Sequence, residues 1–229
     1  MSLLHIANKN HSSWSVRPWV LMKALGIPFQ ECLHRFDARP NPNGALTFVA
    51  QSPSGRLPCL QVGDLLVWDS LAITEYLAEH HPGVWPQNAT ARAFARSAAA
   101  EMHSGFGALR EHCPMSCADR VAMTEWPAAV LADVQRIDSL WREGLYKFGG
   151  PYLAGAEFTA VDAFFVPVAF RALTYQLPFL PAAMAYANTL LNTPAVQAWY
   201  EQALQEAPDA THALPAHYKA ERVAPTAPS

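Results

Sequence analysis

Two neighbouring serines stand where a protein could hold a reactive anion. Ser12 and Ser13 lie in the segment Asn10–Trp19, between a short apolar run and the start of a predicted helix. A helix N-terminus offers free N–H donors and favours negative charge, so a hydroxyl beside it can donate a hydrogen bond to a thiolate and lower the pKa of that thiol. Ser13 or Ser15 could equally be the N-cap of this helix, and capping alone would explain a serine here.

A proline and an acidic residue–serine pair could hold a peptide-like ligand. Pro58 lies at the head of a predicted strand, where an edge position or a cis turn tolerates its missing N–H. A cis Leu57–Pro58 bond would turn the Leu57 backbone outward to pair with a ligand, whereas a trans bond would leave an ordinary edge strand. Asp69 and Ser70 precede another helix, with Ser70 expected as its N-cap. The pair could bind the ammonium and carboxylate groups of an α-amino acid.

The elements predicted around these residues form a small mixed sheet. Strands are expected at 3–7, 29–33, 57–62 and 65–68, and helices from 13 or 15 to 25, over 44–50 and over 71–80. The first strand–helix–strand unit implies parallel pairing, and the turn Gly63–Asp64 favours an antiparallel hairpin. Residues 1–81 are therefore predicted to form an α/β thioredoxin-like domain.

The composition changes after this domain. Residues 1–80 contain 7 alanines, whereas residues 81–229 contain 33, which favours helix. The expected units are a linker at 82–87, an all-α domain at 88–206 and an extended C-terminal tail at 207–229.

Two signals locate helices in the second domain. One long helix is expected from 88 or 90 to about 112, where Pro114 ends it. Thr159 and Asp162 have the spacing of a capping box and predict the start of a later helix.

Composition excludes several classes of protein. The chain is 51% hydrophobic and 15% charged, with a net charge of −3, which rules out general disorder and argues against a nucleic-acid binder. No apolar run approaches the roughly 20 residues that span a bilayer, and the N-terminus is unlike a signal peptide, so we expect a cytoplasmic protein and no membrane partner. The four cysteines form no C-x-x-C pair, and we expect buried thiols and no metal site.

In this order and at this spacing, the three features resemble the cytosolic glutathione transferase superfamily. The resemblance covers roughly residues 1–206, and the segment 150–164 looks like the family's second-domain signature, in which the capping box is structural. It implies glutathione as the co-substrate. It also implies that the cysteinyl backbone and γ-glutamyl group of glutathione are held by Arg56, Leu57, Pro58, Asp69 and Ser70.

The first-helix loop indicates the subtype within this resemblance. Residues 1–20 contain neither tyrosine nor cysteine, and Ser12–Arg17 looks like the serine-type zeta and theta-like branches. Trp14 stands where zeta enzymes usually have cysteine, which counts against their maleylacetoacetate isomerisation. The zeta pattern makes Ser12 the thiol-facing residue and the theta-like pattern makes it Ser13. We favour Ser12, because it lies farther from the helix and is less available as a cap.

The resemblance also implies a second substrate and a homodimer. The expected reaction is attack of the glutathione thiolate on an apolar electrophile. Its pocket is expected to be lined by Trp14, Met102, His103, Phe106 and Arg110. The last four recur at helical spacing, so they could instead pack between helices or across a dimer interface. A glutathione-dependent isomerase or peroxide reductase, or a non-enzymatic binding protein of the same fold, remains an alternative.

Overall fold

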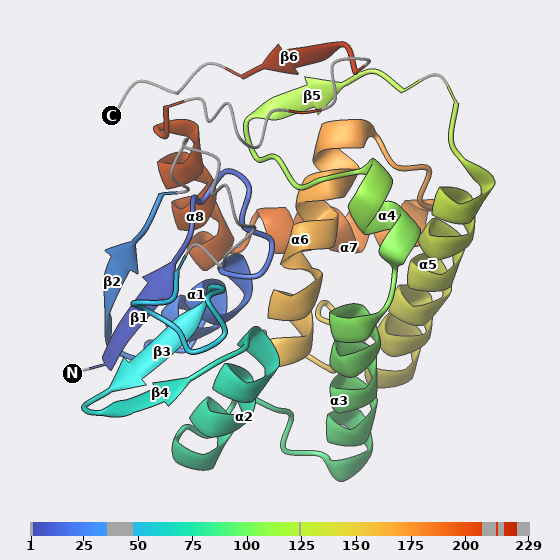
Figure 1. Ribbon diagram of the computed structural model, residues 1–229. Coiled ribbons are helices and arrows are strands. Elements are labelled where there is room, and N and C mark those ends of the chain that lie inside the picture. The colour runs from blue at the N-terminus through green and yellow to red at the C-terminus, as the bar shows by residue number, and fades with distance from the viewer. Residues whose placement is uncertain (1, 36–47, 124, 208–213, 215–217, 224–229) are drawn as a thin grey trace.

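A four-stranded mixed sheet and two helices form the first domain (Figure 1). The structure is a computed structural model that describes residues 2–35, 48–123, 125–207, 214 and 218–223. The elements are β1 (Ser2–Ile6), α1 (Val16–Ala24), β2 (Phe29–Leu33), β3 (Cys59–Val62), β4 (Leu65–Val67) and α2 (Ser70–His80). The strand order is β2-β1-β3-β4, with β1 parallel to β2 and antiparallel to β3. The predicted thioredoxin-like fold is confirmed.

Local sequence explains the pairing. β1 alternates, and its inward residues Leu4 and Ile6 are fully buried. β3 and β4 pair as the predicted hairpin, with Val62 opposite Leu65. Gly63 supplies the positive φ, +60°, that this tight turn requires.

Helices make up most of the second domain. They are α3 (Ala89–Ser104), α4 (Gly107–His112), α5 (Ala128–Phe148), α6 (Ala160–Tyr175), α7 (Pro181–Leu191) and α8 (Pro194–Leu204). α6 is almost entirely buried and contacts α1, α3 and α7, so it is the central helix of the molecule (Figure 1). The predicted capping box at its start is confirmed, since Asp162 accepts the Thr159 N–H at 2.9 Å.

The single long helix expected up to residue 112 is wrong. α3 ends at Ser104, and α4 begins at Gly107 after Phe106 adopts a left-handed conformation with φ +59°. Glycine is a weak helix former, so Gly105 allows the break. Phe106 is only 7% exposed, so the turn places an aromatic ring in the core.

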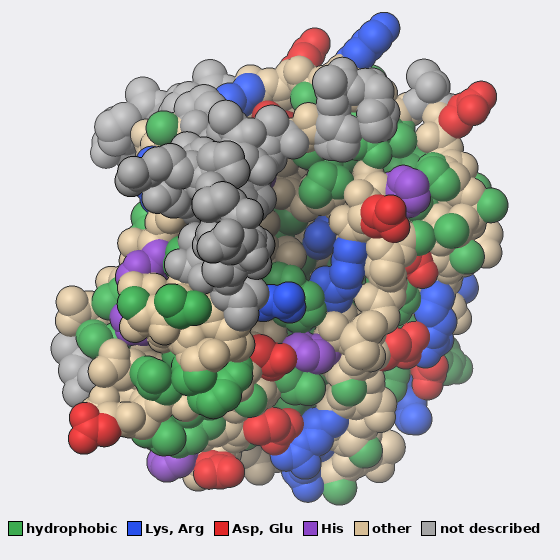
Figure 2. Space-filling model, viewed as in Figure 1, with side chains coloured by type: hydrophobic (Ala, Val, Ile, Leu, Met, Phe, Trp, Pro, Cys, Tyr) green, Lys and Arg blue, Asp and Glu red, His purple; other side chains and the backbone are tan. Residues whose placement is uncertain are grey.

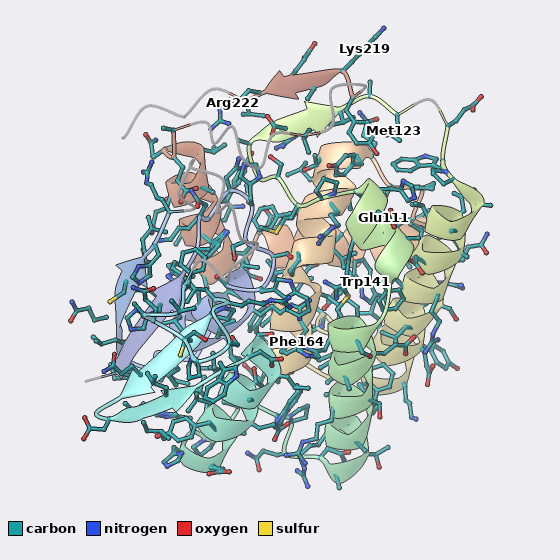
Figure 3. All side chains as sticks on the ribbon, in the orientation of Figure 1. Glu111, Met123, Trp141, Phe164, Lys219 and Arg222 are labelled. Atoms are coloured by element: carbon teal, nitrogen blue, oxygen red, sulfur yellow. The ribbon has the colours of Figure 1, made fainter. Side chains whose placement is uncertain are left out.

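A second, two-stranded sheet was not expected. β5 (Asp119–Val121) pairs antiparallel with β6 (Ala220–Arg222), which belongs to the C-terminal tail. Figures 1 and 3 place this sheet at one end of the molecule, with Arg222 in β6 and Lys219 directly before that strand. Three-residue strands carry too little pattern to be predicted.

Two further findings concern expected segments. The expected helix at 44–50 falls mostly outside the described residues, and its described part, from Phe48, forms a turn. Among the described helices, none combines the length and apolar character needed to cross a bilayer.

Candidate functional site

The loop that carries the two serines, residues 7–15, is held by the second domain, and we call it the serine loop. The carboxylate of Glu206 accepts the N–H groups of Lys9, at 2.7 Å, and Asn10, at 3.0 Å. The Trp199 indole on α8 donates to the Lys9 carbonyl at 3.0 Å. The Asn10 side-chain oxygen accepts the Ala118 N–H at 2.8 Å. Both domains therefore set the position of this loop.

Ser12 and Ser13 are in different hydrogen-bonding situations. Ser12 Oγ donates to Ser15 Oγ at 2.7 Å and accepts the Ser15 N–H at 3.3 Å. The Ser13 hydroxyl makes no hydrogen bond with any described residue. Ser15 is the residue before α1, and its side chain makes no capping bond. Ser12, which we favoured because it lies farther from the helix and is less available as a cap, is thus engaged with Ser15.

The Leu57–Pro58 peptide bond is cis, as predicted. The β3 ladder begins at Cys59, and within the described residues the Leu57 N–H and C=O have no hydrogen-bond partner. Arg56 is exposed, and its N–H donates to the Ser54 hydroxyl at 3.3 Å. The strand after it, β3, lies between β1 and β4, so the edge position considered for Pro58 is wrong. Leu57 thus offers a backbone donor and acceptor just before an inner strand.

Asp69, and not Ser70, is the N-cap of α2. Asp69 Oδ1 accepts the Leu71 N–H at 2.9 Å and the Ala72 N–H at 3.5 Å. Ser70 is the first helical residue, and the expectation that it caps the helix is wrong. Its hydroxyl is fully buried and has no hydrogen-bond partner among the described residues. A buried polar group without a partner is costly, so this hydroxyl marks a place where a ligand could complete the structure.

His103 on α3 reaches the same carboxylate from the second domain. Its Nε2 lies 3.2 Å from Asp69 Oδ2, and its ring packs edge-on against Trp14 with centroids 5.3 Å apart. Burial lowers the pKa of His103, and the nearby arginines Arg17 and Arg110 lower it further, while Asp69 opposes them. Burial thus favours the neutral form of the His103 ring, whose Nε2 faces the Asp69 carboxylate.

The five expected pocket residues separate into two groups. Met102 and Phe106 are buried in the hydrophobic core. Trp14, His103 and Arg110 are half-buried and lie together, since the Arg110 guanidinium sits 4.8 Å from the centre of the Trp14 ring. The side chains left to meet a second substrate are therefore aromatic and polar.

Arg17 on α1 lies behind this group and was not singled out from the sequence. It is fully buried, and none of its three guanidinium nitrogens has a hydrogen-bond partner in the described part of the chain. The guanidinium lies between two rings, 4.3 Å from the centre of Trp14 and 4.8 Å from that of Phe164, which Figure 3 places on α6 where that helix faces the first domain. Burial holds the pKa of Arg17 well below its usual value, and Arg110 and Arg171 lower it further.

Two further arginines complete a cluster with Arg17. Arg110 donates from Nε to the Gly105 carbonyl at 3.0 Å and from one terminal nitrogen to the Met102 carbonyl. Arg171 on α6 is buried and donates to the Cys113 carbonyl at 2.6 Å, and burial lowers its pKa to about 10. Figure 2 shows Lys or Arg side chains in a hollow beside α4, on the face of the molecule that is turned toward the viewer. We call Arg17, Arg110 and Arg171 the arginine cluster.

Comparisons with known proteins agree with this geometry. Residues 11–80 match the family model of the glutathione S-transferase N-terminal domain. A glutathione transferase homologue from Burkholderia GL BGR1 with bound glutathione is 22% identical, covers 88% of this chain and 97% of its own, and gives a TM-score of 0.63. The chain has the glutathione transferase fold.

Two other solved structures with the glutathione transferase fold are similarly distant. A glutathione transferase from Methylococcus capsulatus str. Bath is 21% identical, with 89% and 98% coverage and a TM-score of 0.65. A diazinon-metabolizing glutathione S-transferase from the silkworm Bombyx mori is 16% identical, with 89% and 97% coverage and a TM-score of 0.68. At these identities the likeness establishes the fold. No curated protein sequence matches the chain.

Sequence signals could have pointed to two of the three arginines within this glutathione transferase fold. Arg17 is flanked by apolar residues of α1 that are all buried, and Arg171 is the one basic residue of the apolar helix α6. A basic residue within a run of apolar residues is rare in a core, because burying its charge is costly. That signal marks such residues for attention, but only the structure reveals that they converge.

Proposed function

We propose that this protein is a serine-type glutathione transferase. The observation that carries the proposal is the buried hydroxyl of Ser70, which lacks a partner beside the exposed carboxylate of Asp69. Leu57 offers an unused backbone donor and acceptor in the same domain. The similar Burkholderia protein has bound glutathione, which supports the same ligand here.

The cysteinyl and γ-glutamyl parts of glutathione each have a matching group in this arrangement. The Leu57 N–H and C=O would pair with the cysteinyl backbone as an added strand. The Ser70 hydroxyl and N–H, at a helix start, would hold the γ-glutamyl carboxylate, because helix N-termini bind anions. The Asp69 carboxylate would accept the γ-glutamyl ammonium group.

The reaction needs the thiolate form of glutathione. A free thiol has a pKa of about 8.5, so most of it is protonated at neutral pH. We propose Ser13 as the donor to the thiolate, because its hydroxyl has no hydrogen-bond partner in the described part of the chain. One hydrogen bond to a charged acceptor stabilises it by about 1.5–3 kcal/mol, enough to lower the thiol pKa by roughly one to two units. The thiolate then attacks an electrophilic carbon of the second substrate.

Binding and turnover test the proposal separately. Glutathione binding is measured by calorimetry, and conjugation is followed with 1-chloro-2,4-dinitrobenzene. We expect saturable binding of one glutathione per chain, and turnover that the Ser13→Ala variant reduces. Binding without turnover of any electrophile would reduce the protein to a glutathione-binding protein, and the absence of binding would exclude the proposal.

A further inference from the structure

The arginine cluster concentrates positive charge. Its three guanidinium groups act on one another electrostatically, and two carboxylates, Asp69 and Asp133, oppose them. Within the described residues no ion pair joins a cluster arginine to a carboxylate. Asp69 already caps α2, and Asp133 accepts the Leu109 N–H at 2.9 Å. Among the described residues, the three arginines therefore act with two nearby carboxylates, both of which already accept backbone N–H groups.

The position of Arg17 makes its positive charge costly to the unliganded protein. A guanidinium that is fully buried without a hydrogen bond or counter-ion is expensive, and contacts with the faces of Trp14 and Phe164 offset only part of that cost. Such a cost is reduced when an anion binds nearby. The buried charge of Arg17 therefore favours an anionic ligand.

Arg110 provides the contact point for that ligand. It is half-buried, whereas Arg17 and Arg171 are buried. A guanidinium has five N–H donors, and two of those of Arg110 are used on the Gly105 and Met102 carbonyls, which leaves three. Trp14 is also half-buried, and its indole offers a flat surface next to these donors.

We propose that the second substrate is a planar, conjugated carboxylate, whose acidic group binds Arg110 and whose unsaturated part lies against Trp14. This inference rests on the proposed transferase function and defines the substrate class of that site. Arg17 acts as a positioning residue, because its charge favours the bound anion without touching it. The expectation of a purely apolar electrophile is replaced by that of an acidic one.

Glutathione is also an anion, so the anionic group near the arginine cluster could come from glutathione or from the second substrate. The positions of the arginines distinguish these two ligands. The groups matched to the γ-glutamyl and cysteinyl parts, Ser70 and Leu57, belong to the first domain. Arg110 and Arg171 belong to α4 and α6 of the second domain. Arg17 lies on α1 of the first domain, so it is the charge of Arg110 and Arg171 that we assign to the second substrate.

A pair of aryl chlorides tests the proposal. The probes are 4-chloro-3-nitrobenzoate and its neutral analogue 4-chloro-3-nitrobenzamide. In both reactions the thiolate forms a C–S bond, chloride leaves with the C–Cl bonding pair, and the thiol proton passes to solvent. The kcat/KM for each is divided by its uncatalysed rate constant. We expect a benzoate preference of about 10- to 100-fold, the range for one charge-assisted hydrogen bond.

Variants assign the preference to the cluster. Arg110→Gln should lower the benzoate kcat/KM about tenfold more than the benzamide kcat/KM. Arg17→Met should lower the preference, and Arg17→Lys should retain most of it, because a merely structural role would affect both probes equally. Arg136→Gln is the matched control, since it removes one arginine charge from an exposed pair with Glu101 and should leave the preference unchanged.

A binding experiment separates failure of this proposal from failure of the proposed function. Calorimetry compares 3-nitrobenzoate with 3-nitrobenzamide on protein saturated with S-methylglutathione, which requires no turnover. Tighter benzoate binding without any turnover would support the anion site and exclude the transferase activity. Equal binding of the two analogues would overturn the anion site, as would a loss of glutathione affinity in Arg110→Gln equal to its loss of benzoate affinity.

Discussion

Ser12 and Ser13 are adjacent, yet their hydroxyl groups are engaged differently, and the difference predicts unequal effects of mutation. Ser13→Ala should lower kcat by about 10- to 1000-fold while glutathione affinity changes only a few-fold, because a bond to the thiolate acts mainly on reactivity. Ser12→Ala should act less on kcat, because the Ser12 hydroxyl is bonded to Ser15. Steady-state kinetics with 1-chloro-2,4-dinitrobenzene checks this. The reverse order of effects would return the role to Ser12.

Ser70 and Asp69 should differ in the sign of their effect on stability. Ser70→Ala removes a buried hydroxyl without a partner, so the free energy of unfolding should be unchanged or rise by about 1 kcal/mol. Asp69→Ala removes the N-cap of α2 and should cost about 0.5–2 kcal/mol. Both variants should weaken glutathione binding, by about 10- to 100-fold for Ser70→Ala. Urea denaturation and calorimetry measure the two properties. A large loss of stability in Ser70→Ala would contradict the conclusion that the Ser70 hydroxyl is buried without a hydrogen-bond partner.

Gly144 shows how closely one helix can approach its neighbours. A Cβ placed there would lie 2.7 Å from the Leu153 carbonyl oxygen and 2.8 Å from the Phe94 ring. Gly144→Ala should therefore lower the free energy of unfolding by about 1–3 kcal/mol, despite the better helix propensity of alanine. Gly107→Ala is the matched control, because a Cβ at Gly107 meets no atom within 4 Å and should be neutral or stabilising. Equal thermal denaturation midpoints for the two variants would contradict the close packing.

The sequence was sufficient for elements with a strong local signal. The Gly63–Asp64 turn and the Thr159–Asp162 capping box are short-range features, and both were predicted correctly. The break at Gly105 and Phe106 was missed, because it depends on burying one ring in a core formed by other elements. In the site, Asp69 took the capping role expected of Ser70, since either residue type can cap a helix.

The arginine cluster likewise could not be predicted from the sequence, because it depends on the whole fold. Its members come from α1, α4 and α6, and no local pattern states that they meet. Their unpaired charge is a property of three-dimensional surroundings. Burial and missing partners therefore had to be read from the structure, although the residue types were visible in the sequence.

The hydrogen bonds between Glu206 and the serine loop connect segments near the two ends of the described sequence. Glu206→Ala leaves the buried N–H groups of Lys9 and Asn10 without their acceptor, so it should lower the free energy of unfolding by about 2–5 kcal/mol. It should also lower kcat, because the loop carries Ser13. Glu201→Ala, an exposed site on α8, is the control and should change both by little. Urea denaturation and steady-state kinetics check this. Normal kcat in a destabilised Glu206→Ala would show that the loop holds its shape without this anchor.

That link also fixes when the site can form. Lys9 and Glu206 are 197 positions apart, so the serine loop cannot reach its final conformation until nearly all of the chain has left the ribosome. Contacts of such long sequence separation form slowly, because the intervening chain must be ordered first. A nascent chain that has completed only its first domain, up to the end of α2, would already contain every residue proposed to bind glutathione, yet its thiol-activating loop would be unanchored. During refolding, glutathione conjugation should therefore return later than the helical circular dichroism signal.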